Sequence, residues 1–364
     1  MKISIGSKII EGPYGGGNEY LLNLKNSLEK HGHTVVHDLK DKDLDFIFLT
    51  NPLMNSETST FDNFDIEFYL KFRNAQALTL HRINECDERK NTNFVNKRII
   101  KASKNIDSRI FVSNWLKNLY ETQGISQKNN ITLLGGPNSE VFNNVDKEKW
   151  NGSEKLKIIT HHWSSNPMKG FEIYKKLDDL ISSERWKNKI EFTYIGNLPR
   201  DFKLYNSNVF PAMDKENLSK ELKKHHIYIT ASINEPSGNH HMEAGLSRLP
   251  ILHLNSGALP EYCNNFGVSF DVDNFEYKLE EIIEKYSFYF DQLQNYNFDF
   301  NNSFSTLINH LYYLDSSKTF IIEDRNPYSN IKFILYYIPH KFKKKLYSTF
   351  ISLYKTLLKI FNKI

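Results

Sequence analysis

Cysteine is scarce in this sequence, which contains two cysteines in 364 residues. Cys86 and Cys263 lie far apart and fit no metal-ligand spacing, which excludes a disulfide framework and a cysteine-based zinc site. We interpret Cys86 as a small packed residue rather than a nucleophile. So low a cysteine content is typical of a reducing compartment, and we therefore expect a cytoplasmic protein.

Long apolar runs are missing as well. No window offers the about eighteen uncharged apolar residues that a membrane-spanning helix needs. The first five residues are too short an apolar stretch for a secretory signal and instead predict a buried strand. A formal net charge of +4 is too small to indicate nucleic-acid binding, so no nucleic-acid partner is expected.

The rest of the composition is that of an ordinary globular protein, with 40% hydrophobic and 25% charged residues. At 364 residues the chain exceeds what one hydrophobic core usually serves, which favours two domains. Short apolar runs alternate with longer segments of helical period, the pattern of βαβ units and parallel sheets. The predicted fold class is therefore α/β.

Two series of short apolar runs flank the polar stretch 143–154, which we interpret as a linker. Helices are predicted at 19–31 and 114–123. The strands predicted in the first series are 2–5, 34–37, 45–50, 77–81, 108–113 and 130–134. Those predicted in the second series are 155–161, 190–195, 207–210, 226–230, 250–254 and 267–270.

A glycine-rich segment at 12–18 lies between the first predicted strand and the first predicted helix. In this position backbone amides and the helix dipole can meet an anion such as a phosphate. The glycine spacing is not that of the dinucleotide-binding fingerprint. Glycine-rich turns also serve only to let the backbone pass close to a helix, and the segment alone does not decide between the two roles.

Two glutamates form the second candidate constellation. Glu235 follows the predicted strand 226–230, and Glu243 lies on the helix predicted after it. Both carboxylates are expected at the mouth of a cleft at strand C-termini, where open sheets bind ligands and where carboxylates can hold sugar hydroxyls. The alternative is that both are ordinary helix charges, with Glu235 favoured by the helix dipole.

The order and spacing of these motifs resemble glycosyltransferase family 4 of the GT-B fold, from about Lys2 to Tyr313. The most specific part is the glutamate pair with the downstream segments 249–250 and 256–261. Each of the other motifs is weak singly. These are the glycine segment, Gly32-His33-Thr34-Val35, Ile110-Phe111-Val112-Ser113, Leu134-Gly135-Gly136-Pro137-Asn138 and Lys169-Gly170.

The resemblance implies two Rossmann-like domains facing a central cleft, followed by a C-terminal amphipathic helical tail. An acceptor-side domain is then expected at 1–150 and a nucleotide-sugar-binding domain at 151–300. A helix at 301–318 is expected to cross back to the N-terminal domain, and 319–364 to form the basic tail. The activity implied is retaining hexosyl transfer from a nucleotide-sugar to a hydroxyl of a glycan or lipid-linked acceptor, in surface polysaccharide or lipid-linked glycan synthesis.

The resemblance also implies residue roles on the donor side. Gly16 and Gly17 would approach the donor diphosphate, and Lys169 would neutralise that diphosphate as it leaves. Glu235 would bind hydroxyls of the transferred sugar, and Glu243 the ribose. The other donor-binding positions implied are Ser237, Gly238, Ser256, Gly257 and Ala258.

His81, at the end of the predicted strand 77–81, matches a family histidine beside the transferred sugar. The plain alternative is a hydrogen-bonded histidine at a strand end. Arg82 and Asn84 are expected on the acceptor side. The reaction implied passes through an oxocarbenium-like state in which the leaving diphosphate assists the incoming hydroxyl, so neither a metal nor another cofactor is expected.

Three other functions fit parts of the pattern. A nucleotide-sugar epimerase and a noncatalytic scaffold can share the architecture. A nicotinamide-dependent oxidoreductase would need a glycine fingerprint and a downstream ribose-binding acid, which the sequence does not have in the expected frame.

The chain departs from the family pattern in two places. The family has a Gly-Arg pair shortly before the lysine, where this chain reads 161–168 without an arginine. His162 or Arg82 would then have to supply the second phosphate cation. Arg248 stands where the family tends to have glycine, at the expected C-terminus of a helix.

Metal binding is not expected. Asp43-Leu44-Asp45 and Asp271-Val272-Asp273 have a pattern that some glycosyltransferases use for a divalent ion, but such tripeptides are common in solvated turns. In the pairs His161-His162 and His240-His241, adjacent histidines point apart on a strand and lack further ligands at helical spacing.

The segment from Lys341 predicts a basic amphipathic helix, which Pro339 is expected to separate from the apolar run 331–338. We expect this helix to lie in the interface of an anionic membrane, on the inner face of the cell membrane. Packing on the protein or on a partner chain is the alternative. Its apolar residues are Leu346, Phe350, Leu353, Leu357, Phe361 and Ile364, and its lysines are Lys343, Lys344, Lys345, Lys355, Lys359 and Lys363.

Overall fold

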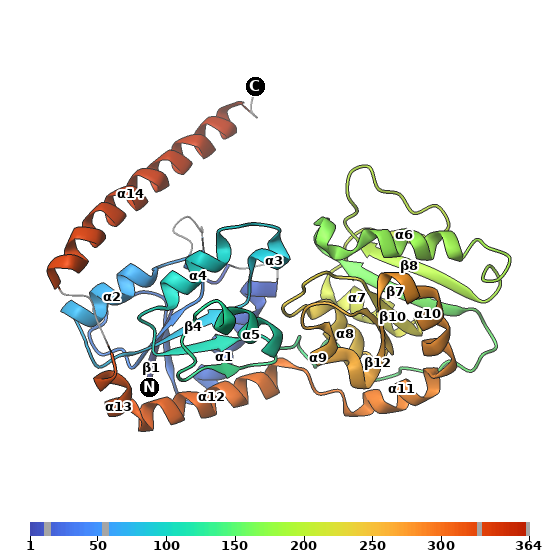
Figure 1. Ribbon diagram of the computed structural model, residues 1–364, viewed down its shortest axis with the longest axis horizontal. Coiled ribbons are helices and arrows are strands. Elements are labelled where there is room, and N and C mark those ends of the chain that lie inside the picture. Colours follow the sequence, from blue (N-terminus) through green and yellow to red (C-terminus); the bar gives the residue numbers. More distant parts are fainter. Residues whose placement is uncertain (11–15, 53–57, 326–329, 362–364) are drawn as a thin grey trace.

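The structure is a computed structural model, which describes residues 1–10, 16–52, 58–325 and 330–361. It contains two lobes, each built on a six-stranded sheet with helices packed against it (Figure 1). All strand pairings in both sheets are parallel, which confirms the predicted α/β class. The N-terminal lobe comprises β1 to β6 with their connecting helices, and the C-terminal lobe comprises β7 to β12 with theirs.

The sheet of the N-terminal lobe has the strand order β2-β1-β3-β4-β5-β6. β3 reads Phe-Ile-Phe-Leu and is buried along its whole length, as expected for a parallel strand covered on both faces. The strands are β1 (Lys2–Ile5), β2 (Thr34–Val36), β3 (Phe46–Leu49), β4 (Leu78–Ile83), β5 (Ser108–Phe111) and β6 (Ile131–Thr132). The helices between them are α1 (Gly16–Lys30), α2 (Asn63–Phe72), α3 (Asp87–Lys90), α4 (Val95–Ser103) and α5 (Asn114–Thr122).

The sheet of the C-terminal lobe has the strand order β12-β11-β10-β7-β8-β9. Its strands are β7 (Leu156–His162), β8 (Ile190–Gly196), β9 (Asn208–Phe210), β10 (Ile227–Thr230), β11 (Ile251–Leu254) and β12 (Gly267–Phe270). Its helices are η1 (Pro167–Lys169), α6 (Phe171–Leu180), α7 (Lys215–Lys223), α8 (Asn239–Leu246), α9 (Leu259–Cys263), η2 (Asn264–Phe266), η3 (Val272–Asn274), α10 (Phe275–Glu284), α11 (Tyr286–Gln292) and η4 (Leu293–Asn295).

Helix α12 (Phe300–Ser316) leaves the C-terminal lobe and packs along the N-terminal lobe (Figure 1). Its residues Phe304, Leu307 and Leu311 are buried in one core with Ile3 and Leu24. Burying a side chain of this size stabilises the fold by roughly 2 kcal/mol. This helix therefore fastens the end of the C-terminal lobe to the N-terminal lobe.

A second connection between the lobes is polar. The carboxylate of Glu261, on α9, accepts a hydrogen bond from the backbone N–H of Asn114 at 2.8 Å and another from that of Trp115. These amides belong to the first turn of α5, where the helix dipole favours a negative charge. Next to Glu261, Tyr262 donates its hydroxyl to the carbonyl of Val112 at 2.7 Å. Helix α9 thus caps α5 across the cleft.

The C-terminal tail consists of α13 (Lys318–Glu323) and α14 (Asn330–Phe361). Pro339 lies inside α14, so the prediction that it separates two segments was wrong. A proline removes one backbone donor from a helix, and a helix of this length keeps its other bonds on both sides. No helix in the described part of the chain is long and apolar enough to cross a membrane.

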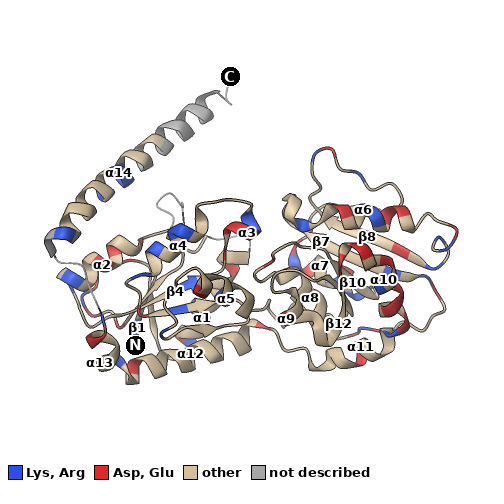
Figure 2. Cartoon of the chain, in the orientation of Figure 1, with Lys and Arg blue, Asp and Glu red and all other residues tan. Residues whose placement is uncertain are grey.

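The first part of α14 is held against α2. Asp62 accepts hydrogen bonds from His340 and Lys344, both at 2.9 Å, and Tyr337 stacks on Phe68. Beyond this contact the helix projects away from the lobe and carries lysines (Figures 1 and 2). Leu346 and Phe350 are exposed there, whereas the side chains of residues 351–361 and all of residues 362–364 lie outside those described.

Candidate functional site

The strand order places a crevice at one edge of the C-terminal sheet. β7 and β10 are neighbours, and the chain continues from them toward opposite edges of the sheet. At such a topological switch point the loops that follow the two strands diverge and leave room for a ligand. Lys169 lies in the short helix η1 after β7, and Glu235 lies in the loop after β10. We call the region of Lys169, Glu235 and Glu243 the switch-point crevice.

Lys169 and Glu235 form a buried ion pair in this crevice. The Nζ atom of Lys169 lies 2.9 Å from Oε2 of Glu235, and the two side chains are 11% and 7% exposed. Arg89, from α3 of the N-terminal lobe, brings a guanidinium nitrogen to 3.4 Å from the same oxygen. Burial acts to raise the pKa of Glu235, but Lys169 and Arg89 together lower that pKa to about 2. Glu235 is therefore ionised at neutral pH and is shared by two cations.

The turn formed by Ser256, Gly257 and Ala258 holds the backbone of Glu235 in place. The backbone N–H of Ala258 donates to the carbonyl of Glu235 at 2.8 Å, and Ser256 Oγ accepts from the backbone N–H of Asn234 at 2.9 Å. Gly257 has a φ of +61°, and a Cβ atom there would lie 2.5 Å from the backbone nitrogen of Glu235. Only glycine fits this position, because both the conformation and the close approach exclude a side chain.

Glu243 lies on α8, which follows the Glu235 loop. Its Oε2 atom is 2.6 Å from Nε2 of His161, the histidine near the end of β7. His161 thereby fixes one carboxylate oxygen, while the other can meet a ligand. The crevice thus brings together the lysine and both glutamates that the sequence predicts, and it adds His161 as a partner that orients Glu243.

Two helix N-termini from different lobes meet beside the crevice. Gly16 begins α1, and a Cβ atom at Gly16 would lie 3.3 Å from the side-chain amide of Asn239, the first residue of α8. Gly17 has open space where a side chain would be. Helix N-termini favour anions, so two of them facing each other suit a phosphate group. Residues 11–15 of the predicted glycine segment lie outside the described residues.

The two remaining predicted donor positions lie at the start of α8. Gly238 is the N-cap residue of α8, and a Cβ atom there would lie 2.4 Å from the ring of His240. Ser237 Oγ is 3.3 Å from the hydroxyl of Tyr262, which reaches it from α9. Both positions therefore belong to the packed base of the crevice.

Buried histidines lie beneath the crevice. His162 is buried with its Nε2 atom 2.6 Å from the hydroxyl of Tyr174, and burial lowers its pKa well below the usual value. A neutral ring cannot supply a phosphate cation, so the expectation that His162 replaces the missing arginine was wrong. His241 is also buried, and burial lowers its pKa to about 3.

The N-terminal lobe has its own cavity of about 430 Å³, whose lining includes Gly16, Gly17, His81, Arg82 and Asn84. His81 is almost wholly buried at its floor, with Nδ1 2.6 Å from Ser103 Oγ, and burial lowers its pKa to about 3. The guanidinium of Arg82 stacks 3.8 Å above the ring of Tyr20. The predicted acceptor-side residues therefore share a cavity with the glycines of α1, and His81 meets it as a neutral ring.

Arg89 was not among the residues predicted to bind a ligand. In the sequence it lies in the mixed-charge run 85–90, which reads as a solvated helix surface. In the structure it reaches Glu235 across the cleft. Its position after the carboxyl end of a predicted strand is the signal that could have found it, because that end of a parallel sheet faces the ligand.

The position of Arg248 fits the family pattern in conformation though not in residue type. It has a φ of +61°, the left-handed conformation in which glycine is common after a helix. Its Nε atom donates to the carbonyl of Phe290 at 3.0 Å, and its guanidinium stacks 4.1 Å from that ring. The arginine side chain is thus accommodated by contacts outside the crevice.

The aspartate patterns considered for a metal have structural partners. Asp43 pairs with Lys2 at 3.0 Å, and Asp45 accepts from the backbone N–H of Lys2 at 2.7 Å. Asp271 caps the short helix η3. In the described part of the chain, no group of three or more His, Cys, Asp or Glu side chains is placed to hold a metal ion. Cys86 is buried, and burial raises its pKa to about 12, which fits a packed thiol.

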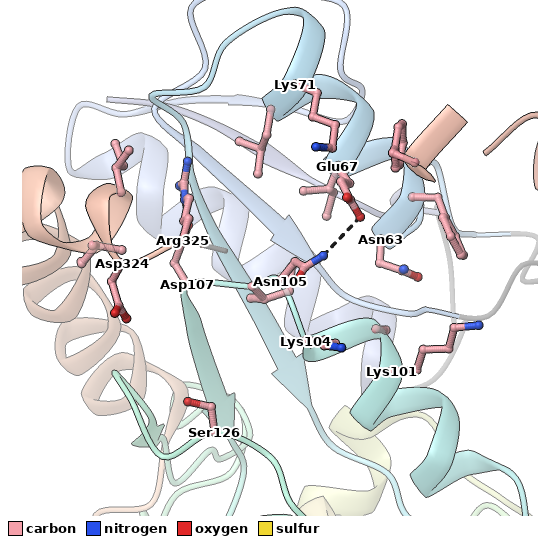
Figure 3. Close-up of a pocket in the computed structure, with 18 of the residues that line it drawn as sticks. Asn63, Glu67, Lys71, Lys101, Lys104, Asn105, Asp107, Ser126, Asp324 and Arg325 are labelled. Carbon is pink, nitrogen blue, oxygen red and sulfur yellow. Dashed lines mark hydrogen bonds and ion pairs between the residues drawn. The ribbon is translucent and has the colours of Figure 1, made fainter. Parts of the chain in front are cut away.

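A larger cavity, of about 870 Å³, lies at the other end of the N-terminal lobe between α2, α4, α13 and α14 (Figure 3). We call it the distal cavity. Arg325 pairs there with Asp107, at 2.7 Å, and Asn105 donates to Glu67 at 3.3 Å. Asp107 directly precedes β5, so this cavity is at the amino ends of the strands. It contains none of the predicted site residues.

Comparison with known proteins supports the fold. No protein-family model matches the chain, and no curated protein matches its sequence. A sucrose-phosphate synthase from Thermosynechococcus elongatus superposes with a TM-score of 0.61, over 87% of this chain and 99% of its own, at 12% identity. The catalytic domain of starch synthase IV from Arabidopsis thaliana, bound to ADP and acarbose, gives a TM-score of 0.62 over 86% and 99%, at 12% identity.

The protein HepE from Anabaena, in complex with UDP, gives a TM-score of 0.63 over 86% of this chain and 100% of its own, at 11% identity. At such low identities the likeness shows the fold alone. This chain therefore has the two-lobed GT-B fold that its motifs predict, while membership of glycosyltransferase family 4 stays a prediction.

Proposed function

We propose that this protein is a retaining glycosyltransferase that moves a sugar from a nucleotide-sugar donor to a hydroxyl acceptor. The observation that carries the proposal is the buried pair of Lys169 and Glu235 at the switch point of the C-terminal sheet. A sugar needs hydrogen-bond acceptors for its hydroxyls, and a leaving diphosphate needs positive charge. The switch-point crevice offers both within the length of one ligand.

The proposed donor position follows from the residues around the crevice. The diphosphate lies between the N-termini of α1 and α8, near Gly16 and Gly17, where backbone N–H groups favour an anion. Glu243 accepts the ribose hydroxyls with the oxygen that His161 does not occupy. Glu235 accepts hydroxyls of the transferred sugar, and the turn 256–258 fixes its backbone for that purpose.

Catalysis in this proposal comes from position and charge. Lys169 stabilises the negative charge that develops on the leaving diphosphate, and the diphosphate in turn assists the incoming hydroxyl. Glu235 is ionised and held by two cations, which suits a hydrogen-bond acceptor better than a nucleophile. His81, whose pKa is about 3, acts as a neutral hydrogen-bonding group beside the sugar. No step requires a metal.

The acceptor enters, in this proposal, from the cavity of the N-terminal lobe. Arg82 and Asn84 line this cavity together with Gly16 and Gly17, so an acceptor bound there would face the donor phosphates and sugar. The acceptor class is a glycan or a lipid-linked glycan. A nucleotide-sugar epimerase is the alternative activity for the same crevice, and it would release the nucleotide without an acceptor.

A thermal-shift screen against UDP, GDP, ADP, CMP and their common sugars, with and without EDTA, tests the proposal. A ligand that binds only the folded state raises the melting temperature. We expect one nucleoside diphosphate to stabilise the protein and the shift to survive EDTA. If no nucleotide changes the melting temperature, the protein is a scaffold with this fold. If the nucleotide-sugar is consumed without an acceptor, it is an epimerase.

We also propose that the tail contacts an anionic membrane from the cytoplasmic side. The exposed Leu346 and Phe350 on a lysine-bearing helix support this, because apolar burial and lysine attraction add at such a surface. The attachment of His340 and Lys344 to Asp62 leaves the outer part of α14 to reach the lipid.

Deleting residues 345–364 keeps this attachment and removes the outer helix. We expect the truncated protein to lose sedimentation with vesicles of phosphatidylglycerol and phosphatidylcholine, while its nucleotide-induced thermal shift stays unchanged. The exposed Lys187→Glu variant of the C-terminal lobe serves as the charge control. Equal sedimentation of the full-length and truncated proteins would contradict membrane contact through the tail.

A further inference from the structure

The switch-point crevice contains more positive than negative charge. Lys169 and Arg89 share one carboxylate, and both contact the same oxygen of Glu235. The nearby Glu85 is taken up by Lys90, whose Nζ atom lies 3.2 Å from it. Lys169, Arg89 and Glu235 are all at most 12% exposed, so water cannot fully compensate the surplus charge. A buried unpaired charge is costly, and a bound anion removes that cost.

One nitrogen of Arg89 has no partner among the described residues. The terminal nitrogen NH2 contacts Glu235, whereas NH1 is buried and makes no hydrogen bond to the described part of the chain. Leaving a charged donor unsatisfied is more costly than leaving a neutral one. A guanidinium offers its donors in a fixed fork, and a phosphate is the anion that matches this geometry.

The segment that presents Arg89 is firmly held. Asp87, at the start of α3, accepts hydrogen bonds from the hydroxyl of Thr92 at 2.5 Å and from the backbone N–H groups of Val95 and Asn96, both at 2.9 Å. These bonds join α3 to the first turn of α4. The arginine is therefore presented by a fixed loop, so that little ordering is needed when a ligand arrives.

A further contact joins the same segments across the cleft. The side-chain amide of Asn234 donates to the carbonyl of Glu88 at 3.2 Å, next to Arg89 and Glu235 in the chain. The lobes therefore meet at the point where the surplus charge lies. An anion bound here would touch groups of both lobes.

We infer that Arg89 is a phosphate ligand for the diphosphate of the nucleotide donor, supplied across the cleft by the N-terminal lobe. This inference rests on the proposed function. Its unpartnered nitrogen takes a phosphate oxygen while Lys169 takes another from the opposite lobe. Phosphate binding then joins the two lobes, and the cation that the C-terminal lobe lacks before Lys169 comes from α3. Donor binding and cleft closure are therefore coupled through one side chain.

Calorimetric titration of the wild type, Arg89→Gln and Arg89→Lys tests the inference. The probes are the nucleoside diphosphate identified by the thermal-shift screen, its monophosphate and its nucleoside. For Arg89→Gln we expect roughly 10- to 100-fold weaker diphosphate binding, since one charge-assisted bond is lost. Nucleoside affinity should be unchanged, and Arg89→Lys, which keeps the charge, should recover part of the loss. Arg200→Gln, an exposed arginine of the C-terminal lobe, is the matched control.

The possible outcomes separate the two proposals. If the wild type binds the diphosphate and Arg89→Gln binds it equally well, the role of Arg89 is refuted and the proposed function stands. If Arg89→Gln weakens the nucleoside and the diphosphate to the same extent, Arg89 only fastens the lobes, which also refutes the inference. If the wild type binds no nucleoside diphosphate at all, both proposals fail.

Discussion

The two lobes contribute to the switch-point crevice in different ways. In the C-terminal lobe, Glu243 is oriented by His161 and Glu235 is held by the turn 256–258, so each glutamate has a partner within its own lobe. The N-terminal lobe reaches the crevice through Arg89 and through the first residue of α1, both by contacts that cross the cleft. The comparison teaches that the C-terminal half of the site is formed in advance, whereas the N-terminal half is completed only when the lobes meet.

The largest expected effect comes from removing the lysine of the preformed half. Lys169→Ala should lower the turnover of the nucleotide-sugar by roughly 10²- to 10³-fold, because a fixed charge opposite the leaving group is lost. Lys176→Ala, an exposed lysine on the next helix, is the control and should keep full turnover. An Arg82→Gln variant that lost as much turnover as Lys169→Ala would show that the N-terminal lobe dominates, which would break the comparison.

Glu243→Ala should act on affinity rather than on rate. We expect the dissociation constant of the nucleotide to rise about tenfold, because a carboxylate that accepts ribose hydroxyls is removed, while turnover at saturating donor changes little. Steady-state kinetics separates the two effects. If Lys169→Ala and Glu243→Ala both keep wild-type activity, the proposed donor position is wrong.

Gly257→Ala tests how far the C-terminal half depends on one turn. With a φ of +61° and a Cβ atom 2.5 Å from the backbone of Glu235, the variant should lose about 2–4 kcal/mol of unfolding free energy. Gly152→Ala is the matched control, since Gly152 has a φ of +81° but no atom within 4 Å of the added Cβ. It should lose only about 1 kcal/mol. Equal losses in urea unfolding would show that the close approach to Glu235 carries no cost.

Acid should act on the C-terminal lobe first. Burial lowers the pKa of His241 to about 3 and that of His253 to about 4, and it lowers those of His162 and His240 well below their usual values. As the pH falls below about 6.5, the unfolded chain binds protons that the folded chain cannot. Stability is therefore full above that pH and is lost toward the lower folded pKa values, by about 1 kcal/mol per histidine at pH 5.5.

Urea unfolding at pH 7 and pH 5.5, followed by limited proteolysis, measures this effect. The N-terminal lobe contains fewer such residues, His81 and His310, whose pKa values burial lowers to about 3 and about 4. We expect the first cleavages at pH 5.5 to lie in the C-terminal lobe. Earlier cleavage of the N-terminal lobe, or an unfolding free energy that does not change with pH, would contradict the expectation.

The fold and the C-terminal half of the site could be predicted from the sequence. Every predicted strand corresponds to an observed one, because continuous apolar runs bounded by turns are a local property of the chain. Lys169, Glu235 and Glu243 could be found because they follow strands that are adjacent at the switch point, and that adjacency is a consequence of the α/β topology.

The contacts across the cleft could not be predicted in the same way. Arg89 lies in a run of charges that has no periodicity, and only the folded arrangement of the lobes brings it to Glu235. The neutral state of His162 depends on burial and on Tyr174, neither of which is visible in the sequence. The error over Pro339 has a related cause, since a proline predicts the end of a helix but a long helix can accommodate it.

Hydrogen exchange measured by mass spectrometry, with and without the stabilising nucleoside diphosphate, tests the central claim most directly. We predict slower exchange in segments 164–172, 232–243 and 256–261 of the C-terminal lobe, together with 16–20 and 87–96 of the N-terminal lobe. Protection in all of these would place the ligand in the switch-point crevice with both lobes in contact. Protection confined to the segments around the distal cavity would contradict the account.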